Sequence, residues 1–389
     1  MSRTSFLVLS FFVLSGTFTA FGQAAGPGAG TFEGQEATIL SNGRLELTVL
    51  NQGSAIASIV LTDGGEKLNP LWNPLRIARD AGRPAEFTGI FGHFVCVDGF
   101  GSPSSEERAA GLPGHGEAHT IRFKATRDEA GNSLTLSGTL PIVQENFSRT
   151  FRMAPGENVV YVDSQLESLL GFDRPVNWAE HATVASPFLE PGQTTIALSG
   201  ARSQNRDYVA SQAATATQRR LVSGKDFTWP MAAGLDGKTV DLSAIPDNPH
   251  YMDHAATLLD PSRKLEWVTA FNADKKLVYG YIFRREDYPW IQHWGNYPSV
   301  AELVRGMEFG TQPYDVSRRD AISRNSLFGT PTYRWLPAKS KIESHFLIFY
   351  ARVPDGFRKV DDVTLQNRTI TIEDRGNAKK IVLAASRGL

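Results

Sequence analysis

The stretch LSNGRLELTVLNQGSAIASIVL, residues 40–61, shows the strand pattern that recurs along the chain. Apolar and polar residues alternate over residues 44–50, and residues 55–61 are apolar and partly β-branched. A period of two places alternate side chains on one face, which is the pattern of a half-buried strand. The dipeptide Asn42-Gly43 before it is typical of a tight turn. The stretch therefore predicts two consecutive β-strands.

Similar short runs recur along the rest of the chain, separated by turn signals such as Pro191-Gly192. We predict further strands at residues 119–125, 133–139, 158–165, 194–199, 265–271, 277–283, 344–352 and 368–372. Long stretches with a period of 3.6 are scarce, and residues 298–305 are the best candidate for a short helix. The pattern predicts an all-β fold, a single large antiparallel β-sandwich, with long loops at residues 75–116 and 200–259.

Composition excludes several classes of function. The 389 residues carry 40 Lys and Arg against 41 Asp and Glu, so the strong basic field of a nucleic-acid binder is absent. A single cysteine, Cys96, excludes an intramolecular disulfide and a cysteine-based zinc site. Because Cys96 lies in the apolar run HFVCV, we expect it to be a buried small residue. The chain also contains no Walker A loop and no G-x-S-x-G elbow.

The N-terminus has the pattern of a secretory signal. One Arg and the free amine are followed by the apolar residues 6–21, with small residues at Ala20 and Gly22. We predict a signal peptide at residues 1–22, with a retained anchor as the alternative, a flexible lead-in at 23–34, and one β-sandwich domain at 35–389. The protein is then expected in the periplasm or outside the cell, without membrane attachment after cleavage.

Two of the eight histidines stand in unusual settings. His115 lies between Gly114 and Gly116, which allow a sharp turn and close approach to a ligand, and we expect it on a loop before a strand that begins near His119. His181, in NWAEHAT at 177–183, is expected just after a strand, among polar and aromatic neighbours. A structural or surface role is the alternative for each.

Glu308 is a third candidate, because it lies between Met307 and Phe309, ahead of a turn at Gly310. A carboxyl group held partly out of water has a raised pKa, which suits a general base. A surface strand glutamate is the alternative.

The order of these three segments resembles that of the galactose mutarotase (aldose 1-epimerase) family. His115-Gly116 matches a His-Gly motif, and Glu308 with Thr311 matches a late Glu-x-x-Thr motif. Asn177, His181 and the following Phe188-Leu189 loosely resemble its second histidine segment. The likeness spans about residues 35–350. His119 stands where the family often has Arg, and the family's Asn-Arg pair before the first histidine is missing, as in a divergent member.

The resemblance implies a supersandwich fold, an aldose substrate and anomer interconversion without metal or cofactor. Glu308 would then be the base, His181 the acid at the ring oxygen, and His115 a donor that positions the sugar. Sugar faces pack on aromatic rings, and a few polar groups orient them. We accordingly expect substrate contacts from a further set of residues: His93, Asp98, Trp178, Trp290, Trp294 and Gln312.

Other functions remain open at this point. A non-catalytic carbohydrate-binding protein of the same fold would not need Glu308 to be desolvated near His181. A polysaccharide lyase or hydrolase is a further alternative, and hydrolysis would need a second carboxylate beside Glu308, from Glu180 or Glu117. A metal site at His250 and His254 would require a helix there, which Pro249 disfavours.

Overall fold

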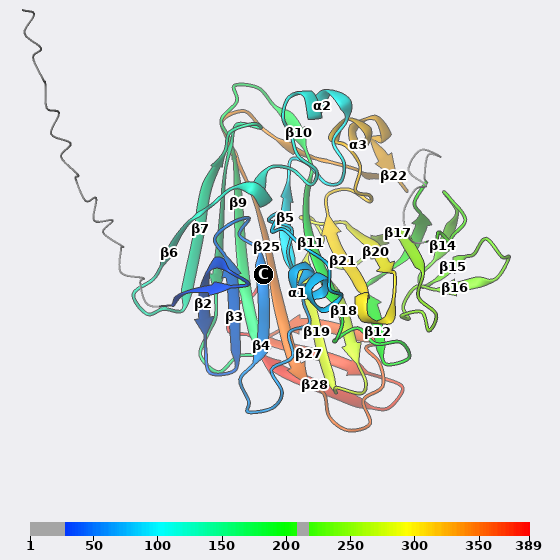
Figure 1. Ribbon diagram of the computed structural model, residues 1–389. Helices are drawn as coiled ribbons and strands as arrows, with labels where there is room; N and C mark the ends of the chain where they lie inside the picture. Colours follow the sequence, from blue (N-terminus) through cyan, green and yellow to red (C-terminus); the bar gives the residue numbers. More distant parts are fainter. Residues whose placement is uncertain (1–27, 208–217) are drawn as a thin grey trace, which may run out of the picture.

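The computed structural model describes residues 28–207 and 218–389, so the predicted signal peptide lies outside the described residues. The described chain is built almost entirely of antiparallel β-strands, arranged as a β-sandwich with a third sheet beneath it (Figure 1). No helix in these two ranges is long and apolar enough to cross a bilayer.

Within the described residues, the larger sheet has thirteen strands. In sheet order they are β1 (Ala29–Phe32), β2 (Gln35–Ser41), β3 (Leu45–Leu50), β4 (Ile56–Leu61), β5 (His93–Val97), β11 (Trp178–Ala185), β21 (Val304–Gly310), β20 (Trp290–Tyr297), β17 (Tyr251–Leu259), β13 (Gly200–Asn205), β14 (Asp226–Thr228), β15 (Met231–Ala233) and β16 (Thr239–Asp241).

The second sheet packs against one face of the first. Its order is β12 (Thr194–Leu198), β18 (Leu265–Asn272), β19 (Leu277–Arg284), β25 (Lys341–Arg352), β9 (Val159–Ser168), β8 (Glu145–Arg152), β7 (Ser133–Leu140) and β6 (Lys124–Arg127). The main apolar core lies between the sheets and contains, for example, Val184 from β11 and Phe346 from β25. We call the face of the larger sheet that points away from this core its outer face.

The C-terminal strands form a small sheet of their own: β26 (Asp362–Gln366), β27 (Thr369–Asp374) and β28 (Lys379–Ala384), drawn in red in Figure 1. Ile370 and Ile372 share a second apolar cluster with Leu347 and Phe349 of β25. Since Phe346 and Ile348 of the same strand belong to the main core, the small sheet covers the opposite face of the eight-stranded sheet.

The described residues also form the short helices α1 (Pro74–Asp80), which packs on the outer face of the larger sheet, α2 (Ser105–Ala109) and α3 (Arg318–Arg324), and the 3₁₀ turns η1 (Ala118–Thr120) and η3 (Val300–Glu302). Two further strand pairs are β10 (Arg174–Val176) with β24 (Arg334–Leu336) and β22 (Ser326–Leu327) with β23 (Thr330–Pro331). Ser104 and Glu107 form a capping box that fixes the start of α2.

Some local expectations are wrong. The strand expected at 119–125 is replaced by η1 and β6, because the backbone of Ile121 and Phe123 bonds instead to Gly53 and Asn51 in the turn after β3. The helix expected at 298–305 is only the 3₁₀ turn η3, since the chain from Val304 onward pairs with strands on both sides. The two expected long loops contain β5 and β13–β17, and the expected lead-in contains β1.

Candidate active site

His181 and Glu308 lie together on the outer face, on the neighbouring strands β11 and β21. The Nε2 atom of His181 is 3.3 Å from the Oε1 atom of Glu308. His181 is 6% exposed and Glu308 is 1% exposed, so the pair is almost free of water. The expectation that His181 follows a strand is corrected, since it lies within β11.

His115 approaches this pair from the loop between α2 and η1. Its ring centroid is 5.2 Å from that of His181. His115 and Gly116 both have left-handed backbone angles, with φ of 64° and 76°, and a side chain at position 116 would collide with the Val97 carbonyl. The N–H of Gly101 donates to His115 Nδ1 over 3.3 Å, which leaves the proton of the neutral ring on Nε2.

Burial sets the protonation of the three groups. It raises the pKa of Glu308 to about 8, against the opposing effects of Gln292, Arg206 and Arg305. Burial, with a smaller effect of His115, holds the pKa of His181 well below its usual value. It also lowers the pKa of His115 to about 4. At neutral pH the Glu308–His181 pair therefore holds one proton, carried by the carboxyl group.

A second polar group of residues lines the site and was not predicted from the sequence. Gln292 on β20 donates to Glu308 Oε2 over 2.5 Å, and its own Oε1 accepts the backbone N–H of Asp315. The Asp315 carboxylate pairs with Arg206 and lies 3.2 Å from His254 Nε2. The amino-acid sequence offers little indication of this group, because the residues come together only through the pairing of strands that are far apart along the chain.

Aromatic rings pack around the pair. Phe94 stacks on His181 with centroids 4.4 Å apart, and Trp294 meets His181 edge to face at 5.9 Å. Trp72 in turn contacts Trp294 at 6.1 Å. Trp290 also lies on β20, is fully buried and donates to the Pro331 carbonyl; its contact with a sugar stays a prediction.

The prediction that His93 and Trp178 contact the sugar is wrong. Both side chains point into the main core and are 0% exposed. His93 Nε2 lies 2.8 Å from Glu180, which also accepts from Arg149 over 2.5 Å and from Trp178 over 3.2 Å. This network joins the two sheets, and strand alternation keeps it on the opposite face from His181.

Asp98 is also misassigned as a sugar ligand. It is 0% exposed, and its carboxylate binds Arg174 of β10 and Arg318 of α3, so that it holds the end of β5 to both elements. Gln312 is 1% exposed and accepts a hydrogen bond from Thr311 over 3.0 Å; its role in binding stays a prediction.

The carboxylates required by the hydrolase alternative do not meet Glu308. Glu180 lies on the opposite face of β11, and Glu117 accepts the backbone N–H groups of Ile142 and Val143. The helix required for a metal site at His254 is replaced by β17. In residues 28–207 and 218–389, no group of three or more His, Cys, Asp or Glu side chains is arranged to hold a metal. Cys96 is buried, as predicted.

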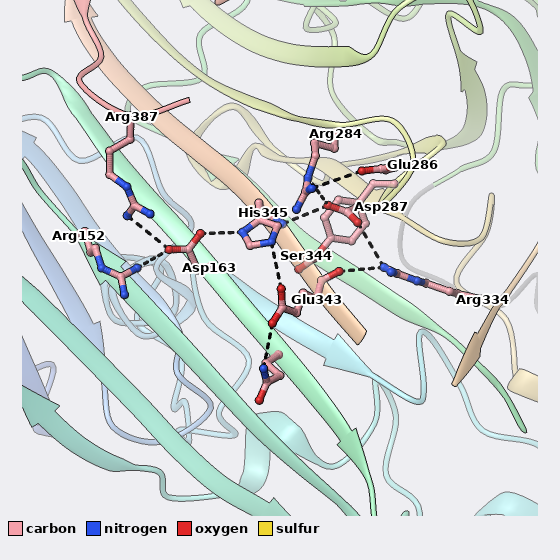
Figure 2. A network of polar contacts seen from close by, with 12 residues as sticks. Arg152, Asp163, Arg284, Glu286, Asp287, Arg334, Glu343, Ser344, His345 and Arg387 are labelled. Atoms are coloured by element: carbon pink, nitrogen blue, oxygen red, sulfur yellow. Dashed lines mark hydrogen bonds and ion pairs between the residues drawn. The ribbon is translucent and has the colours of Figure 1, made fainter. Parts of the chain in front are cut away.

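A different histidine–carboxylate contact lies on the far side of the eight-stranded sheet (Figure 2). His345 Nδ1 is 2.7 Å from Asp163, which also binds Arg152 and Arg387. The Asp163 side chain is 28% exposed. No arginine in residues 28–207 and 218–389 is shown ion-paired with Glu308, which is 1% exposed, and this contrast separates the candidate active site from a surface ion-pair network.

Comparison with known proteins agrees with this architecture. No family model and no curated protein matches the sequence. Among solved structures, a galactose mutarotase related enzyme from Lactobacillus acidophilus is similar, with a TM-score of 0.55 and 13% identity over 85% of this chain and 100% of that one. A galactose mutarotase-like protein from Clostridium acetobutylicum is similar over 83% and 98%, with a TM-score of 0.56 and 12% identity. Identities at this level establish the fold, and the chain therefore has the galactose mutarotase-like fold.

Proposed function

We propose that this protein is an exported enzyme that interconverts the α and β anomers of an aldose. The observation that supports this most directly is the contact between Glu308 and His181, 3.3 Å apart and shielded from water. Acid–base opening of a sugar ring needs one proton acceptor and one proton donor, which this pair supplies from two neighbouring strands. The fold supports the same proposal, since the similar solved structures include proteins described as related to galactose mutarotase.

In the proposed reaction, Glu308 takes the proton of the C1 hydroxyl group. The bond between C1 and the ring oxygen breaks, its electron pair goes to that oxygen, and His181 delivers a proton there. Rotation about the C1–C2 bond and the reverse proton transfers close the ring with the other configuration at C1. His115, with its proton on Nε2, donates a hydrogen bond that orients the sugar.

The proton count of the pair suits this cycle. The catalytic form, carboxylate with imidazolium, contains the same single proton as the resting form, neutral carboxyl with neutral imidazole. Transfer of that proton from Glu308 to His181 on sugar binding would prepare both groups at once. The half-buried Trp294 and Trp72 offer apolar surfaces for the C–H groups of the sugar ring.

The decisive experiment follows optical rotation after single anomers of a panel of aldoses are dissolved with the protein. The wild-type protein should speed the approach to equilibrium for at least one sugar, and Glu308→Gln should lose about 10²–10⁴-fold of that rate. Glu343→Gln, at a carboxylate on the far side of the eight-stranded sheet, serves as the matched control. Sugar binding by the wild type without any acceleration would indicate a binding protein and contradict the proposed activity.

Export is a separate part of the proposal and rests on residues 1–22 of the sequence. When the full chain is produced in a bacterium, the protein outside the cytoplasm should begin near residue 23, as measured by mass spectrometry. Full-length protein retained in the membrane fraction would instead support the anchor.

A further inference from the structure

We infer that Gln292 is a positioning residue that fixes the proton of the pair on Oε1 of Glu308, the oxygen that faces His181. The directions of the hydrogen bonds around Glu308 carry this inference. Its consequence for catalysis rests on the proposed function.

One hydrogen bond beside Glu308 has a direction that cannot be reversed. The backbone N–H of Asp315 can only donate, and it donates to Oε1 of Gln292. The amide of Gln292 is thereby oriented, and its NH₂ group must face Glu308. Since that NH₂ group donates to Oε2 of Glu308 over 2.5 Å, Oε2 is engaged as an acceptor, which favours the proton on the other oxygen.

The other oxygen of Glu308 has the opposite surroundings. Oε1 is buried and accepts no hydrogen bond from any group in the described part of the chain. An ionised Oε1 would lie 3.3 Å from Nε2 of His181 without accepting a hydrogen bond in this geometry, which is costly away from water. A neutral hydroxyl there carries no buried charge and faces Nε2 of His181, 3.3 Å away.

The hydrogen bonds of His181 can run in the same donor-to-acceptor direction. If Nε2 accepts, the ring proton is on Nδ1, and Nδ1 lies 2.8 Å from Oγ1 of Thr183. The Thr183 hydroxyl then points to the backbone carbonyl of His181, 3.5 Å away. From Asp315 to Oε2 of Glu308 the direction is fixed by the backbone N–H, and from Oε1 to Thr183 it follows from the proton on Oε1.

Other charged groups act on Glu308 without altering this order. Those that surround the pair are His115 on its loop, Arg206 after β13, His254 on β17, Arg305 on β21 and Asp315. Arg206 is ion-paired with Asp315 and still lowers the pKa of Glu308.

The experiment measures the Glu308 carboxyl group directly, by infrared difference spectroscopy as a function of pH. The C=O band of the protonated group is assigned by its loss in Glu308→Gln. In the wild type this band should disappear with a midpoint at a pH of about 8. A Glu308 that is ionised from pH 5 to 9 would overturn the inference without any Gln292 variant.

Two substitutions separate positioning of the proton from simple support of the Asp315 loop. Gln292→Met removes the donor and should raise the midpoint by about one pH unit, because the ionised form loses a hydrogen bond. Gln292→Glu can still accept the Asp315 N–H, but its second oxygen cannot donate to Glu308 once it is ionised. It should therefore raise the midpoint at least as far.

The outcomes are distinct. A midpoint unchanged in Gln292→Met, or restored to the wild-type value in Gln292→Glu, would show that Gln292 serves only to hold the loop. Gln165→Met, at the exposed Gln165–Glu343 pair, is the matched control and should leave the midpoint unchanged. If the wild type opens no sugar ring but the midpoints shift as expected, the proposed function fails and the placement of the proton stands.

Discussion

Glu180 and His181 are consecutive residues that lie on opposite faces of β11. The Glu180 carboxylate is bonded to His93 and Arg149 inside the main core, whereas the His181 ring faces Glu308 on the outer face. Two buried histidine–carboxylate pairs, one supporting the sandwich and one suited to chemistry, are thus built from adjacent positions of one strand.

Substitution of His181 should abolish activity without loss of the fold. His181→Gln keeps a polar side chain on the outer face but cannot carry a proton to the ring oxygen. We expect a decrease of about 10²–10⁴-fold in kcat, measured by polarimetry. Circular dichroism and thermal unfolding serve as the control, and a kcat within threefold of the wild type would exclude His181 as the acid.

Activity should depend on pH through a bell-shaped curve. Because the pair must hold one proton, kcat/KM should fall by about tenfold per pH unit above about pH 8, where Glu308 loses it. The acidic limb should lie well below pH 6.5, since burial lowers the pKa of His181. A rate that rises through pH 8 would instead show that the pair acts with no proton.

Stability should also depend on pH through Glu308. Its pKa is raised in the folded state from 4.5 to about 8, so between these values the folded state keeps a proton that the unfolded state has lost. The free energy of unfolding contributed by this group therefore decreases as the pH rises, by about 1.4 kcal/mol per pH unit. Urea unfolding at several pH values should show a flatter profile in Glu308→Gln, and equal slopes would contradict the raised pKa.

The buried ion pair between Arg149 and Glu180 in the main core should tolerate loss of both charges better than loss of one. Arg149→Met leaves the Glu180 carboxylate buried without its cation, and we expect destabilisation by about 3–5 kcal/mol. The double variant Arg149→Met with Glu180→Gln should recover part of this loss. Denaturant unfolding of the two single variants and the double variant gives the coupling energy, and strict additivity would argue against a direct interaction.

Gly306 should be needed for activity because it makes room for Glu308. A Cβ atom at position 306 would collide with Oε1 of Glu308, so Gly306→Ala should push the carboxyl group away from His181. We expect at least a tenfold decrease in kcat, in line with the sensitivity of proton transfer to geometry. If the effect acts through Glu308, adding Gly306→Ala to Glu308→Gln should cause no further loss.

Much of the fold was predictable because apolar and polar residues alternate with a period of two along amphipathic strands. Residues 44–50 and 133–139 alternate clearly, and both form strands within one residue of the expected bounds. The motifs at His115, His181 and Glu308 were identified from local context and resemblance, and the structure brings these three side chains together.

The rest of the site was not predictable for two physical reasons. The strands HFVCV and WAEHATVA are buried on both faces, so their sequences lack the alternation that would reveal which way His93 and Trp178 point. Gln292 and Asp315 acquire their positions from strand pairing and loop contacts, which local sequence does not encode.

The alternating geometry of β11 has a consequence for mutational scanning. In a library that varies residues 178–185 one at a time, the measured effect should alternate along the strand. Substitutions at even-numbered positions should lower the yield of folded protein, and those at odd-numbered positions near the centre should lower turnover. Selection for a new sugar can then vary the odd-numbered positions while the even-numbered positions are kept unchanged.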